Sequence, residues 1–161
     1  MFEFKKYELA SVKKANTATE TISKEEYENR IRELVKCKKD IIYFAEKYFR
    51  IISPAKGLHV IKLFEKQKEM LKNFEQNRRV IVLASRQIGK TTSYTIFVLW
   101  LCTFFPEQKV MICANKLQTA IEIMDRIRLA YEYLPKWLKG AVTTYNKGEI
   151  TFANKSTVRA F

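Results

Sequence analysis

The stretch from Arg79 to Thr92 constrains the fold more than any other part of the chain. It begins with four consecutive apolar residues, Val80 to Leu83. A short apolar run rich in branched side chains is typical of a strand that is covered on both faces of a sheet. A loop that ends in Gly89, Lys90 and Thr91 follows immediately. The sequence therefore predicts a buried strand that leads through a short loop into a helix.

The loop from Ala84 to Thr91 has the spacing of a P-loop, G-x-x-x-x-G-K-[ST], with alanine in place of the first glycine. Alanine tolerates fewer backbone conformations than glycine, so we expect the chain to leave the strand with a negative φ. Successive backbone N–H groups at the start of a helix stabilise several phosphate charges in one place. The pattern predicts a site for ATP and Mg²⁺.

Each position of the loop has a chemical role in this prediction. Gly89 lets the backbone approach the phosphates, Lys90 reaches the β- and γ-phosphates, and the Thr91 hydroxyl holds Mg²⁺. Thr92 is expected to be a weaker phosphate contact. The predicted phosphate-binding residues are Ser85, Arg86, Gln87, Ile88, Gly89, Lys90, Thr91 and Thr92.

The chain is strongly basic, with 30 Lys and Arg against 17 Asp and Glu, a formal net charge of +13. This excess favours a polyanionic partner such as double-stranded DNA. The alternative is a solvated surface that only keeps the protein soluble. No signal peptide or membrane span is apparent in the sequence, so we expect no membrane partner.

The part before the loop predicts an arm followed by helices. Residues 1–22 lack a sustained period and are expected to form an arm, while residues 23–161 are expected to belong to an ATPase domain. Ser23 followed by Glu26 is a capping box, which predicts a helix start, and a second helix is expected from about Asp40. Residues 51–57 are expected to be a loop, followed by an amphipathic helix that contains Gln67.

The part after the loop predicts a fold of the α/β class. A largely apolar helix over residues 91–104 and a second buried strand over 109–114 would complete a βαβ unit, and hence a parallel sheet. A helix is expected over 115–133 and a small antiparallel β-ribbon over 142–161. We therefore predict a P-loop NTPase-type parallel sheet, with only its first βαβ units in this chain.

An acidic Walker B strand is not found after Lys90. Such a strand has four apolar residues followed by Asp, which holds Mg²⁺ and orients the attacking water. No acidic residue downstream of Lys90 follows a strand of this kind. We therefore expect the chain alone to hydrolyse ATP very slowly.

The loop residues 85–92, together with residues 64–71, resemble the large terminase subunit of tailed bacteriophages, the ATPase of the DNA-packaging motor. The resemblance extends to residues 40–48, 114–116 and 150–157 and covers roughly residues 38–161. It implies that Gln67 reads the adenine and that Arg86, with Lys90, is catalytic at the γ-phosphate. It also implies that the Walker B strand and a C-terminal nuclease domain are absent from this sequence.

The resemblance further implies a set of partners and a place in the cell. The family drives double-stranded DNA into a procapsid, together with a portal protein and a small terminase subunit, and a homo-oligomeric ring on the portal is a further expectation. The expected location is the host cell cytoplasm, transiently at the procapsid portal. The competing interpretation is a nucleotide-regulated DNA-binding or helicase-like module without a packaging role.

Overall fold

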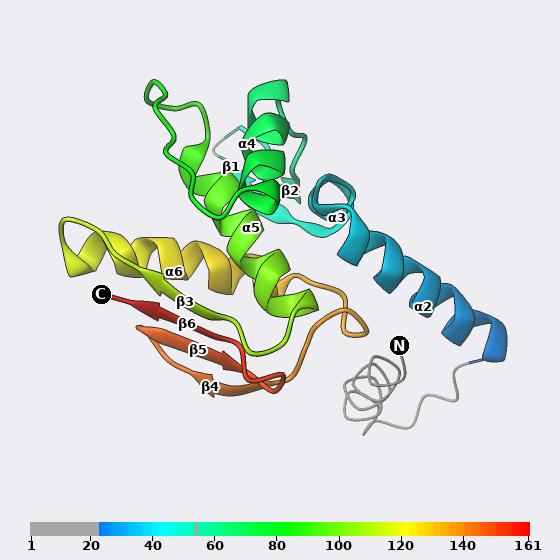
Figure 1. Cartoon of the computed structure of the whole chain (residues 1–161). Helices are drawn as coiled ribbons and strands as arrows, with labels where there is room; N and C mark the ends of the chain where they lie inside the picture. Colours follow the sequence, from blue (N-terminus) through cyan, green and yellow to red (C-terminus); the bar gives the residue numbers. More distant parts are fainter. Residues whose placement is uncertain (1–22, 54) are drawn as a thin grey trace.

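The fold is known from a computed structural model, which describes residues 23–53 and 55–161. The arm predicted at residues 1–22 lies outside these residues. Figure 1 shows helix α5 running from the loop that precedes it, at one end of the molecule, to a four-stranded sheet at the other. The helices are α2 (Lys24–Lys39), α3 (Ile41–Tyr48), α4 (Glu65–Gln76), α5 (Lys90–Phe104) and α6 (Leu117–Glu132). The strands are β1 (Arg50–Ser53), β2 (Gly57–Val60), β3 (Lys109–Ile112), β4 (Val142–Tyr145), β5 (Glu149–Phe152) and β6 (Thr157–Ala160).

The first two helices begin at the polar residues that the sequence indicated. The Ser23 hydroxyl accepts a hydrogen bond from the Glu26 amide at 3.1 Å, so α2 starts at the predicted cap. The Asp40 carboxylate accepts from the amides of Ile42 and Tyr43 at 2.8 and 3.0 Å, which starts α3. Both side chains satisfy amides that a helix leaves without a partner in its first turn.

The predicted loop at residues 51–57 is wrong, because this segment forms most of a β-hairpin. β1 pairs with β2 in antiparallel register, with Arg50 opposite Val60 and Ile52 opposite Leu58. Consecutive isoleucines favour extended backbone, and Gly57 supplies a φ of 61° where β2 begins. The helix expected next begins only at Glu65, and its first turn is capped by Gln67, which accepts from the Phe64 amide at 3.1 Å.

The main sheet has the order β3-β6-β5-β4 and is mixed rather than parallel. β3 and β6 are parallel, whereas β6, β5 and β4 are joined by antiparallel pairing. The strand predicted at 109–114 and the ribbon predicted at 142–161 are therefore confirmed as elements. The ribbon is not separate, however, because β6 extends it into the sheet beside β3.

The buried strand predicted at Val80–Leu83 is not formed. These residues have no regular secondary structure, and the side chains of Ile81 and Leu83 are 97% and 99% exposed. An extended segment is stable as a strand only when a neighbouring strand satisfies its amides and carbonyls, and β3 pairs with β6 alone among the described strands. Figure 1 shows the segment before α5 rising away from the sheet. The predicted βαβ unit is therefore incomplete.

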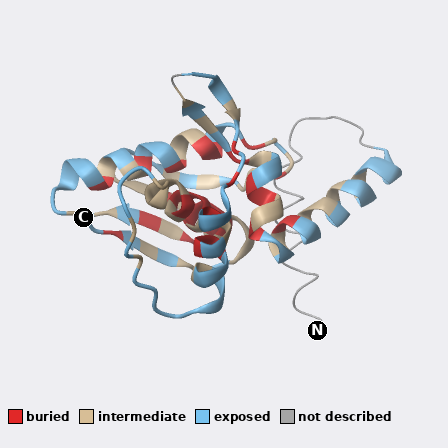
Figure 2. Cartoon of the chain, turned by 90° about the horizontal axis from the view of Figure 1, so that it is seen from above, coloured by how far each residue is buried: buried red, intermediate tan, exposed pale blue. Residues whose placement is uncertain are grey.

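Helix α5 is the central element of the core. It packs against α3, α4 and α6, and most of its residues between Ser93 and Cys102 are buried. Figure 2 shows the buried positions gathered where this helix meets the sheet. At its C-terminal end, Asn154 donates to the Cys102 carbonyl and Ser156 to the Phe105 carbonyl, both at 2.8 Å. These bonds tie the turn between β5 and β6 to α5 and fix the helix against the sheet.

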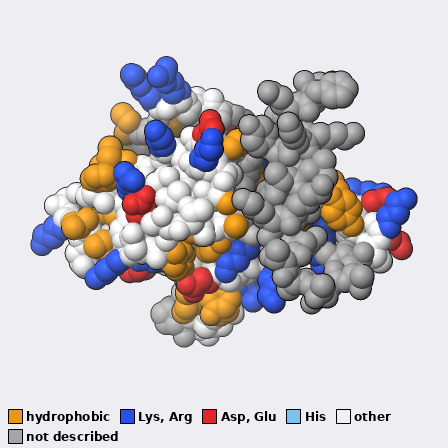
Figure 3. Space-filling view, turned by 90° about the horizontal axis from the view of Figure 1, so that it is seen from below, with side chains coloured by type: hydrophobic (Ala, Val, Ile, Leu, Met, Phe, Trp, Pro, Cys, Tyr) orange, Lys and Arg blue, Asp and Glu red, His pale blue; other side chains and the backbone are white. Residues whose placement is uncertain are grey.

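The basic side chains form no single patch on the visible described part of the face below the sheet. Figure 3 shows Lys and Arg dispersed around the face below the sheet, where the described residues are visible, and not gathered in one patch. None of the helices in the described part of the chain is both long and apolar enough to cross a bilayer.

Candidate phosphate-binding site

The loop before α5 turns sharply and leaves the helix N-terminus open. Gln87 and Gly89 have φ values of 65° and 88°, both in the left-handed region. Gly89 is the N-cap of α5, and it has no side chain with which to cap the first-turn amides. The first turn also contains no acidic residue. These amides are therefore free to donate to an anion, and the helix dipole favours negative charge there.

Lys90 lies folded over this loop. Its ammonium donates to the carbonyls of Ala84 and Ser85, each at 2.7 Å. Among the described residues it has no carboxylate partner. The charge is therefore held at the loop by two neutral acceptors, and no ion pair has to break before it can contact a phosphate.

Gln67 of α4 packs directly against the loop. It is 4% exposed, and a Cβ built on Gly89 would lie 2.1 Å from its Nε2 atom. Its Oε1 atom accepts from the Phe64 amide, but no described residue accepts a hydrogen bond from Nε2. Gln67 as a residue is buried, but its Nε2 atom is not among the fully enclosed unpartnered atoms of the described residues, so this donor is accessible to a bound group beside Gly89.

The other predicted residues divide by exposure. Ser85, Arg86 and Gln87 are exposed at the tip of the loop, and Arg86 has no ion pair among the described residues. Ile88, Thr91 and Thr92 are half-buried. The structure thus brings Gln67, Gly89 and Lys90 together, while the Arg86 guanidinium remains free in solvent.

The described residues contain no protein-only metal cage. No group of three or more His, Cys, Asp or Glu side chains within them could hold a metal ion. Thr91, in the first turn of α5, is the one predicted metal ligand. A magnesium ion here would therefore need phosphate oxygens and water for most of its coordination.

Residues 81–160 match the family described as the N-terminal region of the large terminase subunit, T4likevirus-type. The matched segment runs from the loop before α5 through α5, β3 and α6 into β6, about half of the chain. The chain belongs to the large terminase family. This family supplies a component of the DNA-packaging motor, and the resemblance drawn from the loop and the ribbon is thereby confirmed.

A cavity of about 320 Å³ lies beside the first turns of α5 in this terminase chain. Thr92 and Thr95 contribute to its wall, and so do Arg50 of β1 and Arg126 of α6. Sequence analysis did not single out either arginine. No sequence signal could have done so, because the two residues are far apart in the chain and meet only through the packing of α6 against β1.

Proposed function

We propose that the loop at residues 85–92 binds the triphosphate of ATP, and that the chain is the ATP-binding portion of a viral DNA-packaging motor. The observation that carries the proposal is the convergence of three sets of donors on one loop, none of which has a carboxylate partner among the described residues. These are the open N-terminus of α5, the Lys90 ammonium and the Gln67 amide. Each donor suits an anionic or hydrogen-bonding group of a nucleotide.

The residues fit ATP and Mg²⁺ in their chemistry. The first-turn amides of α5 would hold the phosphates without mobile counter-charges, and Lys90 would exchange its two carbonyl partners for phosphate oxygens. Thr91 would supply a hydroxyl to the magnesium ion. Gln67 would direct its Nε2 donor towards the nucleotide, in agreement with an adenine-reading role.

Arg86 is the proposed catalytic arginine, together with Lys90. An exposed guanidinium without an ion pair can turn towards a γ-phosphate at no cost in broken salt bridges. Bound ATP would supply the free energy of phosphoanhydride cleavage. The part of this chain is to bind and orient the nucleotide and to place positive charge where negative charge develops.

Membership of the terminase family favours DNA packaging over a helicase-like role. In the proposed motor, ATP hydrolysis moves double-stranded DNA into a procapsid at the portal, in the host cell cytoplasm. The net charge of +13 suits a protein that works on a polyanion. Portal protein and small terminase subunit are the protein partners of this proposal.

The test is isothermal calorimetry with ATP and Mg²⁺ on Lys90→Ala. We expect the variant to bind ATP at least about 10-fold more weakly, because a charge-assisted contact to the phosphates is lost. Lys72→Ala is the matched control. Lys72 is exposed on α4, so this substitution removes the same charge outside the loop. Wild-type affinity in Lys90→Ala, or equal weakening in both variants, would contradict the phosphate-loop assignment.

A further inference from the structure

The arginines of the described residues divide by whether they form ion pairs. Arg30, Arg32, Arg128 and Arg159 each pair with a carboxylate. Three of the unpaired arginines lie in or just before the phosphate loop, at positions 78, 79 and 86. The remaining two are Arg50 and Arg126, which come from distant parts of the chain and line one cavity. Their convergence is a feature that the nucleotide site does not explain.

The wall of the cavity contains both buried and exposed residues. Phe49 and Thr95 are 2% and 1% exposed and form its buried side. Arg50 of β1 and Arg126 of α6 are exposed residues of this wall. The guanidinium groups therefore reach solvent while their elements are held by the core.

The electrostatics of this cavity favour an anion. Two guanidinium groups share the cavity, and the positive end of the α5 dipole lies nearby, because Thr92 stands in the first turn of that helix. No described carboxylate forms an ion pair with either arginine. An anionic ligand would therefore meet two positive charges without displacing a carboxylate.

We propose that Arg50 and Arg126 bind the phosphate backbone of duplex DNA at this cavity. Guanidinium groups present a planar set of donors that matches phosphate oxygens. Two exposed arginines on the wall of one cavity suit phosphates that repeat along a strand, and DNA is the polyanion on which the terminase family works. The choice of DNA as the ligand rests on the proposed packaging role. It does not depend on ATP binding at Lys90.

The proposed nucleotide site and the arginine-lined cavity both contact the first turn of α5. Thr92 lines the cavity, and its neighbour Thr91 is the proposed magnesium ligand in the same helical turn. DNA held by Arg50 and Arg126 would therefore lie beside the first turn of α5. A nucleotide-dependent shift of this turn would reach the DNA contact directly.

The test is the salt dependence of binding to a fluorescein-labelled 30-base-pair duplex, followed by fluorescence anisotropy with the 161-residue chain. Each phosphate contact contributes about 0.9 to the slope of log affinity against log salt concentration. We expect the double variant Arg50→Ala/Arg126→Ala to lower the magnitude of this slope by about 2, and to weaken binding by roughly 10-fold or more at low salt.

The control is Lys72→Ala/Lys136→Ala, which removes the same charge at two exposed positions away from the cavity. Its slope should stay near the wild-type value. Arg50→Gln/Arg126→Gln, which keeps most of each aliphatic stem, replaces the alanine pair if thermal unfolding shows that pair to be unfolded.

Three results would overturn the proposal. The first is an unchanged slope in a folded double variant, which would leave this face to a protein partner. The second is an equal loss in the lysine control, which would mean that only net charge matters. The third is complete displacement of the arginine-dependent binding by 1 mM inorganic phosphate, since the cavity would then hold a small anion and not DNA.

Discussion

Gln67 occupies the space that a side chain on Gly89 would need. A Cβ on Gly89 would lie 2.1 Å from Gln67 Nε2, and the same Gln67 side chain caps α4 through the Phe64 amide. Helix α4 and the loop before α5 are therefore packed tightly against each other. The requirement for glycine has two sources at this position, since the φ of 88° is also in the left-handed region.

Gly89→Ala is expected to destabilise the protein more than a glycine substitution that meets only backbone strain. A left-handed conformation costs an L-residue about 1–2 kcal/mol. The new methyl group also forces the Gln67 side chain to move, which breaks its hydrogen bond to the Phe64 amide. Losing this bond lowers the free energy of unfolding by about 1 kcal/mol. Urea unfolding of the variant measures the sum.

Gly57→Ala is the matched control for this prediction. Gly57 has a φ of 61°, and nothing lies within 4 Å of a Cβ built on it. This variant should therefore lose only the backbone part of the free energy of unfolding. Equal destabilisation of the two variants would show that Gln67 yields to the methyl group without cost.

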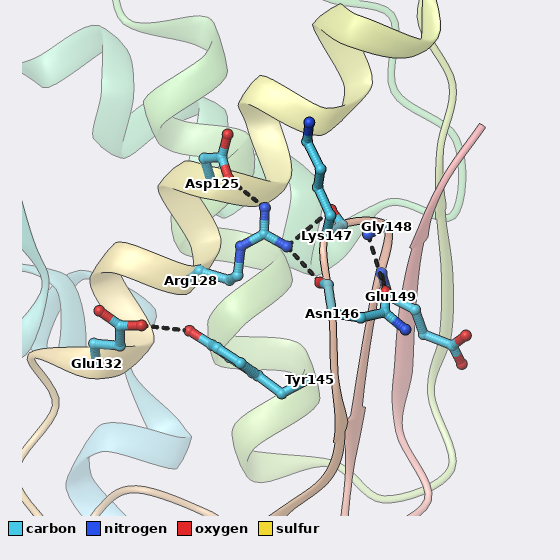
Figure 4. A network of polar contacts seen from close by, with 8 residues as sticks. All are labelled: Asp125, Arg128, Glu132, Tyr145, Asn146, Lys147, Gly148 and Glu149. Carbon is cyan, nitrogen blue, oxygen red and sulfur yellow. Dashed lines mark hydrogen bonds and ion pairs between the residues drawn. The ribbon is translucent and has the colours of Figure 1, made fainter.

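Arg128 fastens the turn between β4 and β5 to helix α6. Figure 4 shows its guanidinium reaching the turn, where it donates to the carbonyls of Asn146 and Lys147 at 2.5 and 2.8 Å and also pairs with Asp125. We expect Arg128→Ala to lower the free energy of unfolding by about 2 kcal/mol, because two turn carbonyls lose a charged donor. Chemical denaturation measures the loss, and hydrogen exchange at the Gly148 amide should accelerate.

Arg126→Ala gives the comparison within the same helix. Arg126 is exposed and has no ion pair among the described residues, so its removal should change stability by less than about 0.5 kcal/mol. A loss in Arg126→Ala as large as that in Arg128→Ala would mean that the guanidinium contacts seen at the turn do not stabilise the fold.

Glu33 is the centre of a polar cluster between α2 and α3. Its Oε1 atom accepts from Lys47 at 2.5 Å, from Tyr43 at 2.7 Å and from Tyr48 at 2.9 Å. Burial alone raises the pKa of Glu33, but these hydrogen bonds outweigh burial and lower the pKa from 4.5 to about 2. A carboxylate with a lowered pKa stabilises the fold above its unfolded pKa, and this contribution is lost as the pH falls from about 4.5 towards 2.

Glu33→Gln is therefore expected to cost up to about 3 kcal/mol at pH 7, and the difference from wild type should shrink between pH 4.5 and 2. Urea unfolding at a series of pH values measures both. Glu28→Gln serves as the control, because its 3.7 Å pair with Arg32 is exposed on both sides and should contribute less than about 1 kcal/mol. A difference for Glu33→Gln that is constant with pH would rule out the ionised carboxylate as its source.

The local elements could be predicted from the sequence because their causes are local. Ser23 and Glu26 predict the start of α2, and the apolar run after Lys90 predicts α5, since capping and helical propensity act within a few residues. The packing of Gln67 against Gly89 was not predictable from residue pattern alone. An exposed helical glutamine and a buried one have the same sequence, and only the resemblance to terminases pointed to this residue.

The features that the sequence did not predict correctly all depend on contacts between residues that are distant in the chain. Val80–Leu83 has a strand composition but no strand beside it, and Ile51–Gly57 has loop-forming residues but pairs as β1 and β2. Whether a segment forms a strand depends on a partner that is distant in sequence. The convergence of Arg50 and Arg126 is a third example, because only the packed structure brings β1 and α6 together.

Arg86 is exposed in the loop, and the sequence alone does not decide whether it is a catalytic arginine or a structural or DNA-facing one. A catalytic arginine stabilises charge that develops in the transition state, so Arg86→Ala should keep ATP affinity within a few-fold and cut turnover by roughly 10³ or more. A structural or DNA-facing arginine would instead alter stability or DNA affinity and spare hydrolysis. The measurement is single-turnover hydrolysis beside nucleotide affinity, in the assembled packaging motor with DNA and procapsids. Arg79→Ala is the control, because it removes an exposed arginine just before the loop, and it should leave turnover within a few-fold of wild type. Unchanged turnover in Arg86→Ala would exclude a catalytic role for Arg86 and would leave Lys90 and Thr91 in their proposed roles.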